Sequence, residues 1–327
     1  MANTFPFEVV PARPRRPLVG WLTSAAGWLA VYGMASLWFV LFGAAMESYS
    51  ELIGLLVFVA LAPAVVGAFP WCIRLIAQGR RIRAPRALDL LLSDPRPPVL
   101  LLRSFQDDDL IDPSFPATSQ TVPVRYESRL AAALRTLGPV IALGRPGEPE
   151  PELGAARLYV EDADWQDAVQ YFMDRTAAVV AIVAESQGLW WEIEVAIQRV
   201  RSERLLLFFP FPAPAKVLGS FWRSALLQNP LWGKWLRRKA VPGMEADRQE
   251  RYEQFRARFS NSLKYPLPDR LGRSRFVHFD RAGGPQLLPP RSPSLIVRLL
   301  TLNFRETLDV PFSRELRPFV AKVAGAL

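Results

Sequence analysis

Two long stretches without a charged residue constrain this chain more than any other feature. They cover Pro17 to Met46, 30 residues, and Leu52 to Ile73, 22 residues. A helix needs roughly 20 apolar residues to cross a hydrocarbon core of about 30 Å. The apolar region of a signal peptide has only about 7 to 15 residues, and neither stretch shows the polar stripe of a helix on a soluble domain. We therefore predict transmembrane helices over residues 18–46 and 52–73.

The flanking charges predict how this hairpin is oriented. Arginine and lysine near the ends of a transmembrane helix stay on the cytoplasmic side. Arginines precede the first stretch and follow the second, whereas the connector from Glu47 to Glu51 has none. We therefore expect a multi-pass protein of the inner or plasma membrane, in contact with the lipid bilayer and with both termini cytoplasmic. The flanking arginines are Arg13, Arg15, Arg16, Arg74, Arg80, Arg81, Arg83 and Arg86.

The net charge of +9 does not point to nucleic acid. Residues 1–86 hold eight basic and three acidic residues, so more than half of the excess flanks the predicted membrane helices. The remaining 241 residues carry only +4. A basic face of the kind that binds nucleic acid is not expected from so small an excess.

Cysteine and histidine are too scarce for several kinds of chemistry. Cys72 is the only cysteine and His278 the only histidine. This excludes a disulfide within the chain and disfavours His/Cys zinc sites and Ser-His-Asp catalysis. We expect no metal site, and any catalysis must rest on carboxylates.

The rest of the chain divides into a soluble domain and its connections. We expect a cytoplasmic N-terminal segment over residues 1–17 and a basic, proline-rich linker over 74–98, which its prolines should hold extended. An α/β domain should cover 99–210, with a helical extension over 211–327 packed on it. Within that extension, residues 221–241 are rich in tryptophan and basic residues, typical of a helix that packs on the domain or rests on the inner leaflet.

Short apolar runs alternate with amphipathic helices in the α/β domain. This alternation predicts a mostly parallel, doubly wound sheet in which residues 99–105 and 177–184 form neighbouring or near-central strands. Ligands bind such sheets at the carboxyl ends of the strands. The predicted strands are 99–105, 139–143, 156–160, 177–184 and 205–209, with a further one at 276–279; the predicted helices are 124–137, 165–176, 189–202, 245–263 and 313–324.

The loops at these strand ends resemble the conserved boxes of TIR (Toll/interleukin-1 receptor) domains. The first strand ends in Arg103-Ser104-Phe105 and is followed by Asp107, Asp108 and Asp109, as in the first TIR box. Arg145-Pro146-Gly147 is similar to the BB loop. Ser186 and Trp190-Trp191-Glu192-Ile193 resemble the box after the third strand. The resemblance covers about Val99 to Pro210. Two features depart from the TIR pattern: Glu192 directly follows Trp191, and an additional segment runs from Leu153 to Gln170.

The resemblance implies a fold similar to flavodoxin and one of two functions. Some TIR domains cleave nicotinamide from NAD with a glutamate at the start of the helix after the third strand, and others act only as assembly surfaces. On the first alternative NAD is a substrate, no cofactor is needed, and Glu192 stabilises the oxocarbenium-like transition state. On the second, the domain is a non-enzymatic scaffold that self-associates as a homo-oligomer beneath the membrane.

Each candidate residue also has an ordinary structural interpretation. Glu192 could simply favour the helix dipole, and Glu194 competes for the catalytic role. Arg103 and Arg145 suit a pyrophosphate but could be solvated surface residues. Asp108 and its neighbours could bind a cation or begin a helix, and Trp191 could stack on a base or pack in the core. The predicted ligand-binding residues are Arg103, Ser104, Phe105, Asp108, Arg145, Gly147, Ser186 and Trp191, with Glu192 as the catalytic residue.

Overall fold

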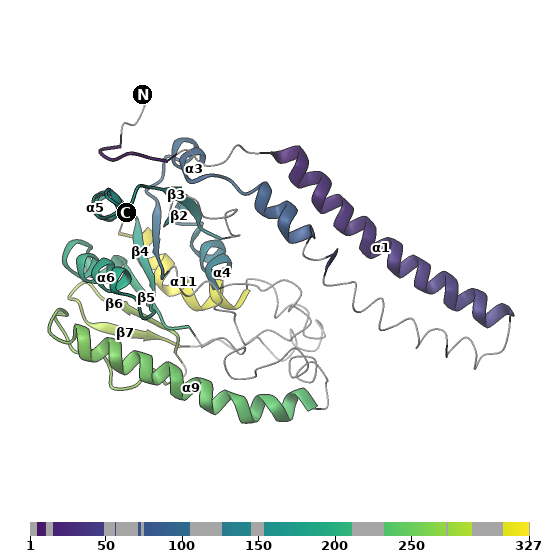
Figure 1. Cartoon of the computed structure of the whole chain (residues 1–327). Helices are drawn as coiled ribbons and strands as arrows, with labels where there is room; N and C mark the ends of the chain where they lie inside the picture. Colours follow the sequence, from purple (N-terminus) through teal and green to yellow (C-terminus); the bar gives the residue numbers. More distant parts are fainter. Residues whose placement is uncertain are drawn as a thin grey trace.

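The computed structural model describes residues 5–10, 16–48, 56, 71–72, 75–104, 126–144, 154–210, 232–272, 274–289 and 310–326. Its body is a seven-stranded mixed sheet with helices on both faces, from which a long N-terminal helix projects (Figure 1). The strands are β1 (Val99–Leu102), β2 (Val140–Gly144), β3 (Ala156–Tyr159), β4 (Ala178–Ile182), β5 (Leu205–Phe208), β6 (Phe276–Phe279) and β7 (Pro285–Leu288). The helices are α1 (Pro17–Ser48), α3 (Ala87–Ser93), α4 (Tyr126–Leu134), α5 (Trp165–Met173), α6 (Gln187–Arg199), α9 (Trp232–Phe259) and α11 (Val310–Ala324).

The strand order is β3-β2-β1-β4-β5-β6-β7, and the first five strands are parallel. β1 and β4 are hydrogen-bonded neighbours, with Val99 opposite Ala178 and Leu102 opposite Ala181. This confirms the predicted pairing of the two most apolar runs. Both strands are buried along their whole length, which is why their sequences are continuously apolar rather than alternating.

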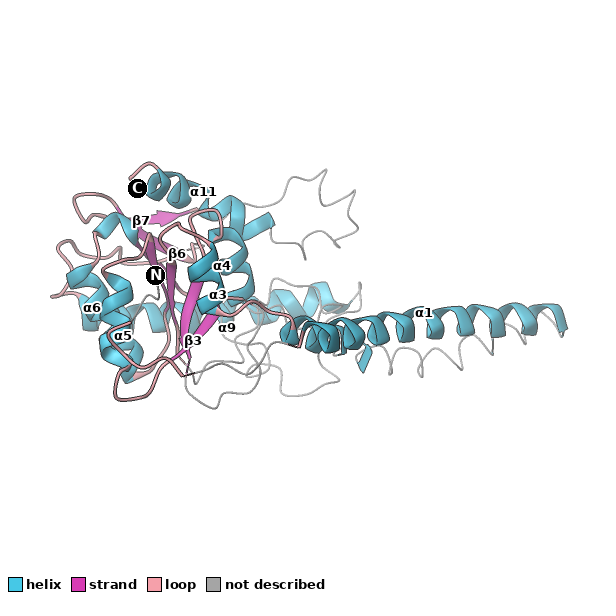
Figure 2. Ribbon diagram, turned by 90° about the horizontal axis from the view of Figure 1, so that it is seen from above, coloured by secondary structure: helices cyan, strands magenta, loops and turns pink. Residues whose placement is uncertain are grey.

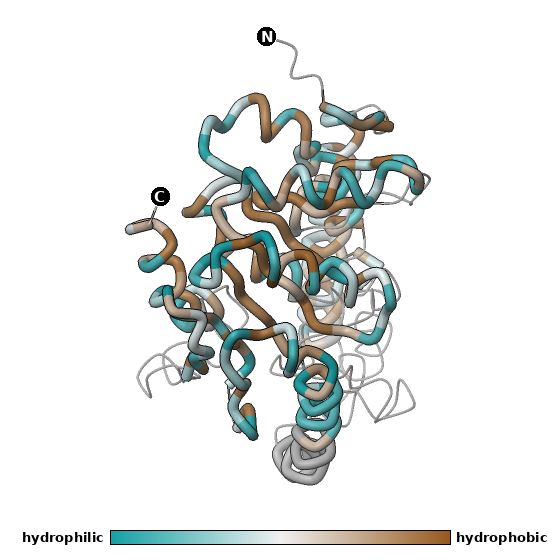
Figure 3. The backbone as a smooth tube through the Cα atoms, turned by 90° about the vertical axis from the view of Figure 1, so that its left-hand side faces the viewer, coloured by the Kyte–Doolittle hydropathy of each residue, from teal (hydrophilic) through white to brown (hydrophobic). Residues whose placement is uncertain are grey.

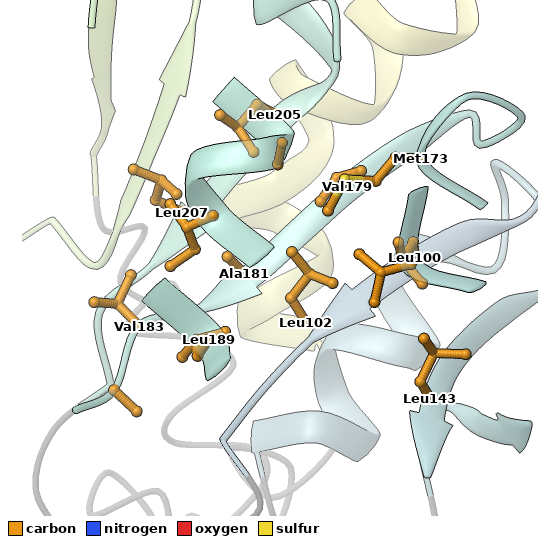
Figure 4. Close-up of a cluster of buried hydrophobic side chains, with 14 of the residues drawn as sticks. Leu100, Leu102, Leu143, Met173, Val179, Ala181, Val183, Leu189, Leu205 and Leu207 are labelled. Carbon is orange, nitrogen blue, oxygen red and sulfur yellow. The ribbon is translucent and has the colours of Figure 1, made fainter. Parts of the chain in front are cut away.

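Two hydrophobic layers sandwich the sheet. Helices α5, α6 and α9 cover one face, and α4 and α11 cover the other (Figures 1 and 2). Successive side chains of a strand point to opposite faces, so Leu100 and Leu102 join the first layer whereas Val99 and Leu101 join the second. Figure 3 shows the brown, apolar strands in the middle of the body, between helices in which hydrophilic and hydrophobic residues alternate. Figure 4 shows side chains of the first layer, from β1, β4 and β5 to Leu189 of α6.

The C-terminal region differs from the predicted helical extension. β6 pairs antiparallel with β5, Phe276 opposite Phe208, and β7 pairs antiparallel with β6. The rings of Phe208 and Phe276 stack at 4.8 Å, and α9 and α11 supply core residues on opposite faces. The boundary placed at residue 210 therefore falls inside one hydrophobic core, because β6 and β7 complete the sheet. Residues 221–231 lie outside the described part of the chain, so the two alternatives for 221–241 are not distinguished.

The linker is also not extended as predicted. Residues 75–82 are helical, and α3 follows within the same segment. Pro85 precedes α3 and Pro95 follows it, so these prolines bound a helix rather than interrupt one.

α1 is long and apolar enough to cross a membrane, by length and composition, over Pro17–Ala44. Only 6% of its most apolar window is buried. Large side chains such as Leu18, Leu22 and Leu29 are at least 70% exposed. A core helix of a soluble domain would cover this surface, so α1 presents its apolar side chains to its surroundings.

The N-terminal half of α1 packs closely against the helical residues 71–72 and 75–82. A Cβ atom on Gly20 would lie 2.7 Å from the Gly79 carbonyl oxygen, and one on Gly27 would lie 2.8 Å from that of Cys72. Because a higher residue number in α1 meets a lower one in its partner, the two segments run antiparallel. Small residues permit such backbone approach between helices in a membrane. The other residues of the predicted second helix, except Leu56, lie outside the described part of the chain.

A polar contact adds to this helix pair at its N-terminal end. Arg83 donates to the Ser24 hydroxyl at 3.1 Å, and its guanidinium lies 4.0 Å from the centre of the Trp21 ring. Ser24 is itself buried by the contact. This arginine is thus held at the point where the apolar part of α1 begins.

Gly79→Leu should separate this helix pair, because a Cβ there overlaps the Gly20 carbonyl oxygen and the Ser24 hydroxyl. Gly43→Leu is the matched control, since no residue that the structure describes lies within 4 Å of a Cβ at that position. We expect oxidative cross-linking between cysteines placed at Ser24 and Ile76 to fall strongly in the first variant and to persist in the second. Equal yields in both variants would contradict close glycine packing.

Candidate functional site

The carboxyl ends of β1 and β4 are where ligands bind in sheets of this order. The chain leaves β1 toward β2 on one side and returns to β4 on the other, and such a reversal opens a crevice at the carboxyl edge of a parallel sheet. Arg103 and Ser104 directly follow β1, and Ser186 follows β4. The structure thus brings three of the predicted residues to one edge of the sheet.

Ser186 begins α6 as its N-cap. Its hydroxyl oxygen accepts a hydrogen bond from the Leu189 backbone N–H at 3.3 Å, which satisfies one of the N–H groups that a helix start leaves unpaired. This contact gives Ser186 a structural role at the edge of the sheet.

Glu192 is buried inside the helical layer, with 5% of its surface exposed. Its position follows from helix periodicity: Leu189, Glu192 and Ala196 are three and four residues apart, so they lie on one face, which packs on the sheet. Glu194 points to solvent. The structure therefore separates the two glutamates that the sequence left in competition.

Burial raises the pKa of Glu192 to about 8, because the charged carboxylate loses its hydration. The nearby Trp165 indole N–H opposes this rise, although it does not reach full hydrogen-bond geometry with any described residue. Within the described part of the chain, no ion pair reaches Glu192. The side chain is therefore largely protonated at neutral pH, and its charge is not available to stabilise a cationic transition state in this conformation.

Two tryptophans lie near Glu192. The rings of Trp165, the first residue of α5, and Trp191 lie 5.1 Å apart. A Cβ on Gly188 would lie 3.5 Å from the Trp165 ring, so the ring rests against the first turn of α6. Trp191 packs on the core and against Trp165, and of these two rings it is Trp165 whose indole lies beside the Glu192 carboxyl group.

Arg103 lies on the opposite face of the sheet. Its guanidinium is 3.4 Å from the Glu127 carboxylate of α4, and Arg157 of β3 approaches the same carboxylate at 3.8 Å. The Ala155 N–H also donates to Glu127, at 3.2 Å. All three charged side chains are at most 7% exposed. Arg103 is therefore not a solvated surface residue, which was its ordinary structural interpretation.

Arg103 and Glu192, both assigned to the candidate site from the sequence, therefore lie on opposite faces of the sheet. Strand alternation explains the outcome: Leu102 faces the α6 layer, so the following Arg103 points toward α4. Ser104 is buried at the strand end. Phe105, Asp108, Arg145 and Gly147 lie outside the described residues.

Sequence reasoning missed Glu127, Arg157 and Trp165. Arg157 interrupts an apolar strand, and Glu127 lies in the first turn of an amphipathic helix. A charged residue within a buried strand needs an oppositely charged partner, and this requirement could have predicted the pair from the sequence. Among the described residues, no group of three or more metal-binding side chains occurs.

No protein-family model matches the chain, and neither a curated protein nor a solved structure matches it.

Glu192→Gln should remove a pH-dependent loss of stability. The unfolded side chain ionises near pH 4.5, whereas the folded one keeps its proton until about pH 8. The wild type therefore loses free energy of unfolding as pH rises through this interval, and the glutamine variant does not. We expect the difference between them to grow by on the order of 2–4 kcal/mol from pH 5 to pH 8.

Urea unfolding of the full chain in detergent measures this difference. Glu194→Gln is the control, because that side chain is exposed, and its curve should parallel the wild type. Parallel curves for wild type and Glu192→Gln would show that the carboxyl group is hydrated and ionised in the folded protein.

Proposed function

We propose that this chain is a membrane-anchored α/β signalling or effector domain, TIR-like in architecture, held at the cytoplasmic face of the inner or plasma membrane by a helical hairpin. The observation that supports this anchor is a contact between the segment before α1 and the α/β body, two parts of the chain that the apolar region separates. Val9, before α1, forms an antiparallel bridge with Val160, after β3. This contact supports a topology in which residues 5–10 and the α/β body lie on one side of the membrane.

This contact supports a second crossing. If α1 crosses once, the chain must return before β1 so that both ends can meet. The uncharged run over 52–73 and the helical residues that pack antiparallel to Gly20 and Gly27 are the natural return path. Removal of α1 as a signal sequence fits less well, because Phe7, ahead of it, is buried in the core of the domain.

The arginines favour the cytoplasmic side for this shared face. Arg16 precedes α1, and Arg80, Arg81, Arg83 and Arg86 follow the second crossing near the same end of the helix pair. The lipid bilayer is thus the first partner of the chain, with self-association through the α/β body as a further proposal.

Cysteine labelling tests this topology, in a chain whose Cys72 is replaced by serine. Tyr49→Cys should react with a membrane-impermeant maleimide on intact cells. Thr4→Cys and Gly325→Cys should react only after permeabilisation. Labelling of Gly325→Cys on intact cells would contradict the proposed anchor.

Hydrolysis of an NAD-type nucleotide is the second candidate function. It is favoured by one observation: a buried carboxyl group with a raised pKa beside two tryptophans near the carboxyl edge of the sheet, a combination common at functional sites. Because Glu192 is protonated when covered, this proposal requires Trp165 to move before the carboxylate acts on a bound nucleotide. The scaffold alternative requires no such movement.

Glu192→Gln should reduce any NAD turnover by roughly 10²-fold or more, because it removes the group that stabilises the transition state. The full chain in nanodiscs, with and without enforced clustering, is incubated with NAD and the products are separated. Glu194→Gln should keep wild-type turnover. Absence of turnover in the clustered wild type would leave the scaffold as the function.

A further inference from the structure

The segment ahead of α1 is bound to the α/β body by backbone and side-chain contacts. The Val10 N–H donates to the Tyr159 carbonyl oxygen at 2.9 Å, next to the bridge between Val9 and Val160. Phe5 and Phe7 stack on each other and contact the rings of Tyr171 and Phe172 of α5. Residues 5–10, here called the strap, thus extend the sheet beyond β3 and pack on α5.

The strap also forms a hydrogen bond with the residue that precedes α5. The Glu8 N–H donates to the Asp164 carboxylate at 3.0 Å. Asp164 is the N-cap of α5, yet its side chain makes no capping hydrogen bond. An aspartate at this position ordinarily accepts from the N–H groups of the first helical turn. With the strap docked, the Asp164 carboxylate therefore binds Glu8 while the capping position of α5 is left without its side chain.

Trp165 connects the hydrogen bonding of Asp164 to the buried Glu192. Trp165 follows Asp164 directly, and its ring lies on Gly188 and beside Trp191, over Glu192. If the Asp164 side chain turned inward to cap α5, the conformation of the first turn of that helix would change, and Trp165 is the first residue of this turn. Only five residues, 11–15, separate the strap from Arg16, a reach of at most about 20 Å.

We propose that the strap couples the membrane helix to the Glu192 region, so that a docked strap keeps Trp165 over Glu192. While the strap is docked, Asp164 is held by Glu8 and Trp165 covers Glu192. Displacement of α1 pulls the strap from β3 and α5, frees Asp164 to cap α5, and uncovers Glu192. This coupling goes beyond the proposed function, since it needs neither turnover nor a particular ligand.

Hydrogen exchange of the full chain tests the coupling. A protease site inserted between Val10 and Arg16 is cut and the released peptide removed; the uncut insertion variant is the control. We expect exchange in residues 165–173 and 187–193 to rise about tenfold or more, because the loss of two packed phenylalanines outweighs the stabilisation that a new Asp164 cap gives to the first turn of α5. Exchange in β4 and β5 should stay unchanged.

A double variant provides the same release without cleavage. Phe5→Ala combined with Phe7→Ala should increase exchange in the same two segments, whereas Phe39→Ala, on the exposed face of α1, should not. An increase confined to residues 154–160 would overturn the coupling, because the strap would then affect only the strand beside it. Lost protection throughout β4 and β5 would overturn it too, because the strap would be an ordinary part of the core.

Discussion

The pairing of residues 5–10 with the end of β3 constrains everything else in this chain. A long, exposed apolar helix separates two segments that touch each other. If that helix lies in a membrane, the geometry requires an even number of crossings between Val10 and β1. The glycine contacts between α1 and residues 71–82 then follow as the packing of a hairpin whose two ends must converge on one face.

The same pairing links the segment before α1 to the chemically unusual part of the body. Asp164 bonds the strap, Trp165 follows it, and Glu192 lies beneath Trp165. A buried protonated acid costs stability at neutral pH, and such costs are common where function requires a perturbed group. The Arg103–Glu127–Arg157 cluster, on the other face, instead ties β1, β3 and α4 together.

Local patterns in the sequence predicted much of the fold. The apolar runs at 99–105 and 177–184 correctly indicated two central parallel strands, because burial on both faces leaves a continuous apolar signature. β7 was missed: only one of its four residues, Leu288, is buried. The strap was missed although Phe5, Phe7 and Val9 alternate as in a strand, since its partner is about 150 residues away. At the site, strand alternation would have separated Arg103 from Glu192, but the length of β1 was not known in advance.

Disulfide trapping of the strap in native membrane vesicles tests the account most directly. Partners in an antiparallel bridge lie within disulfide range, so Val9→Cys and Val160→Cys, in a chain with Cys72→Ser, should cross-link rapidly and within one molecule under mild oxidation. Val9→Cys paired with Glu253→Cys, on the exposed face of α9, should not. Absence of the first cross-link in the membrane would contradict the account, because nothing would then hold the segment before α1 on the same side as the α/β body.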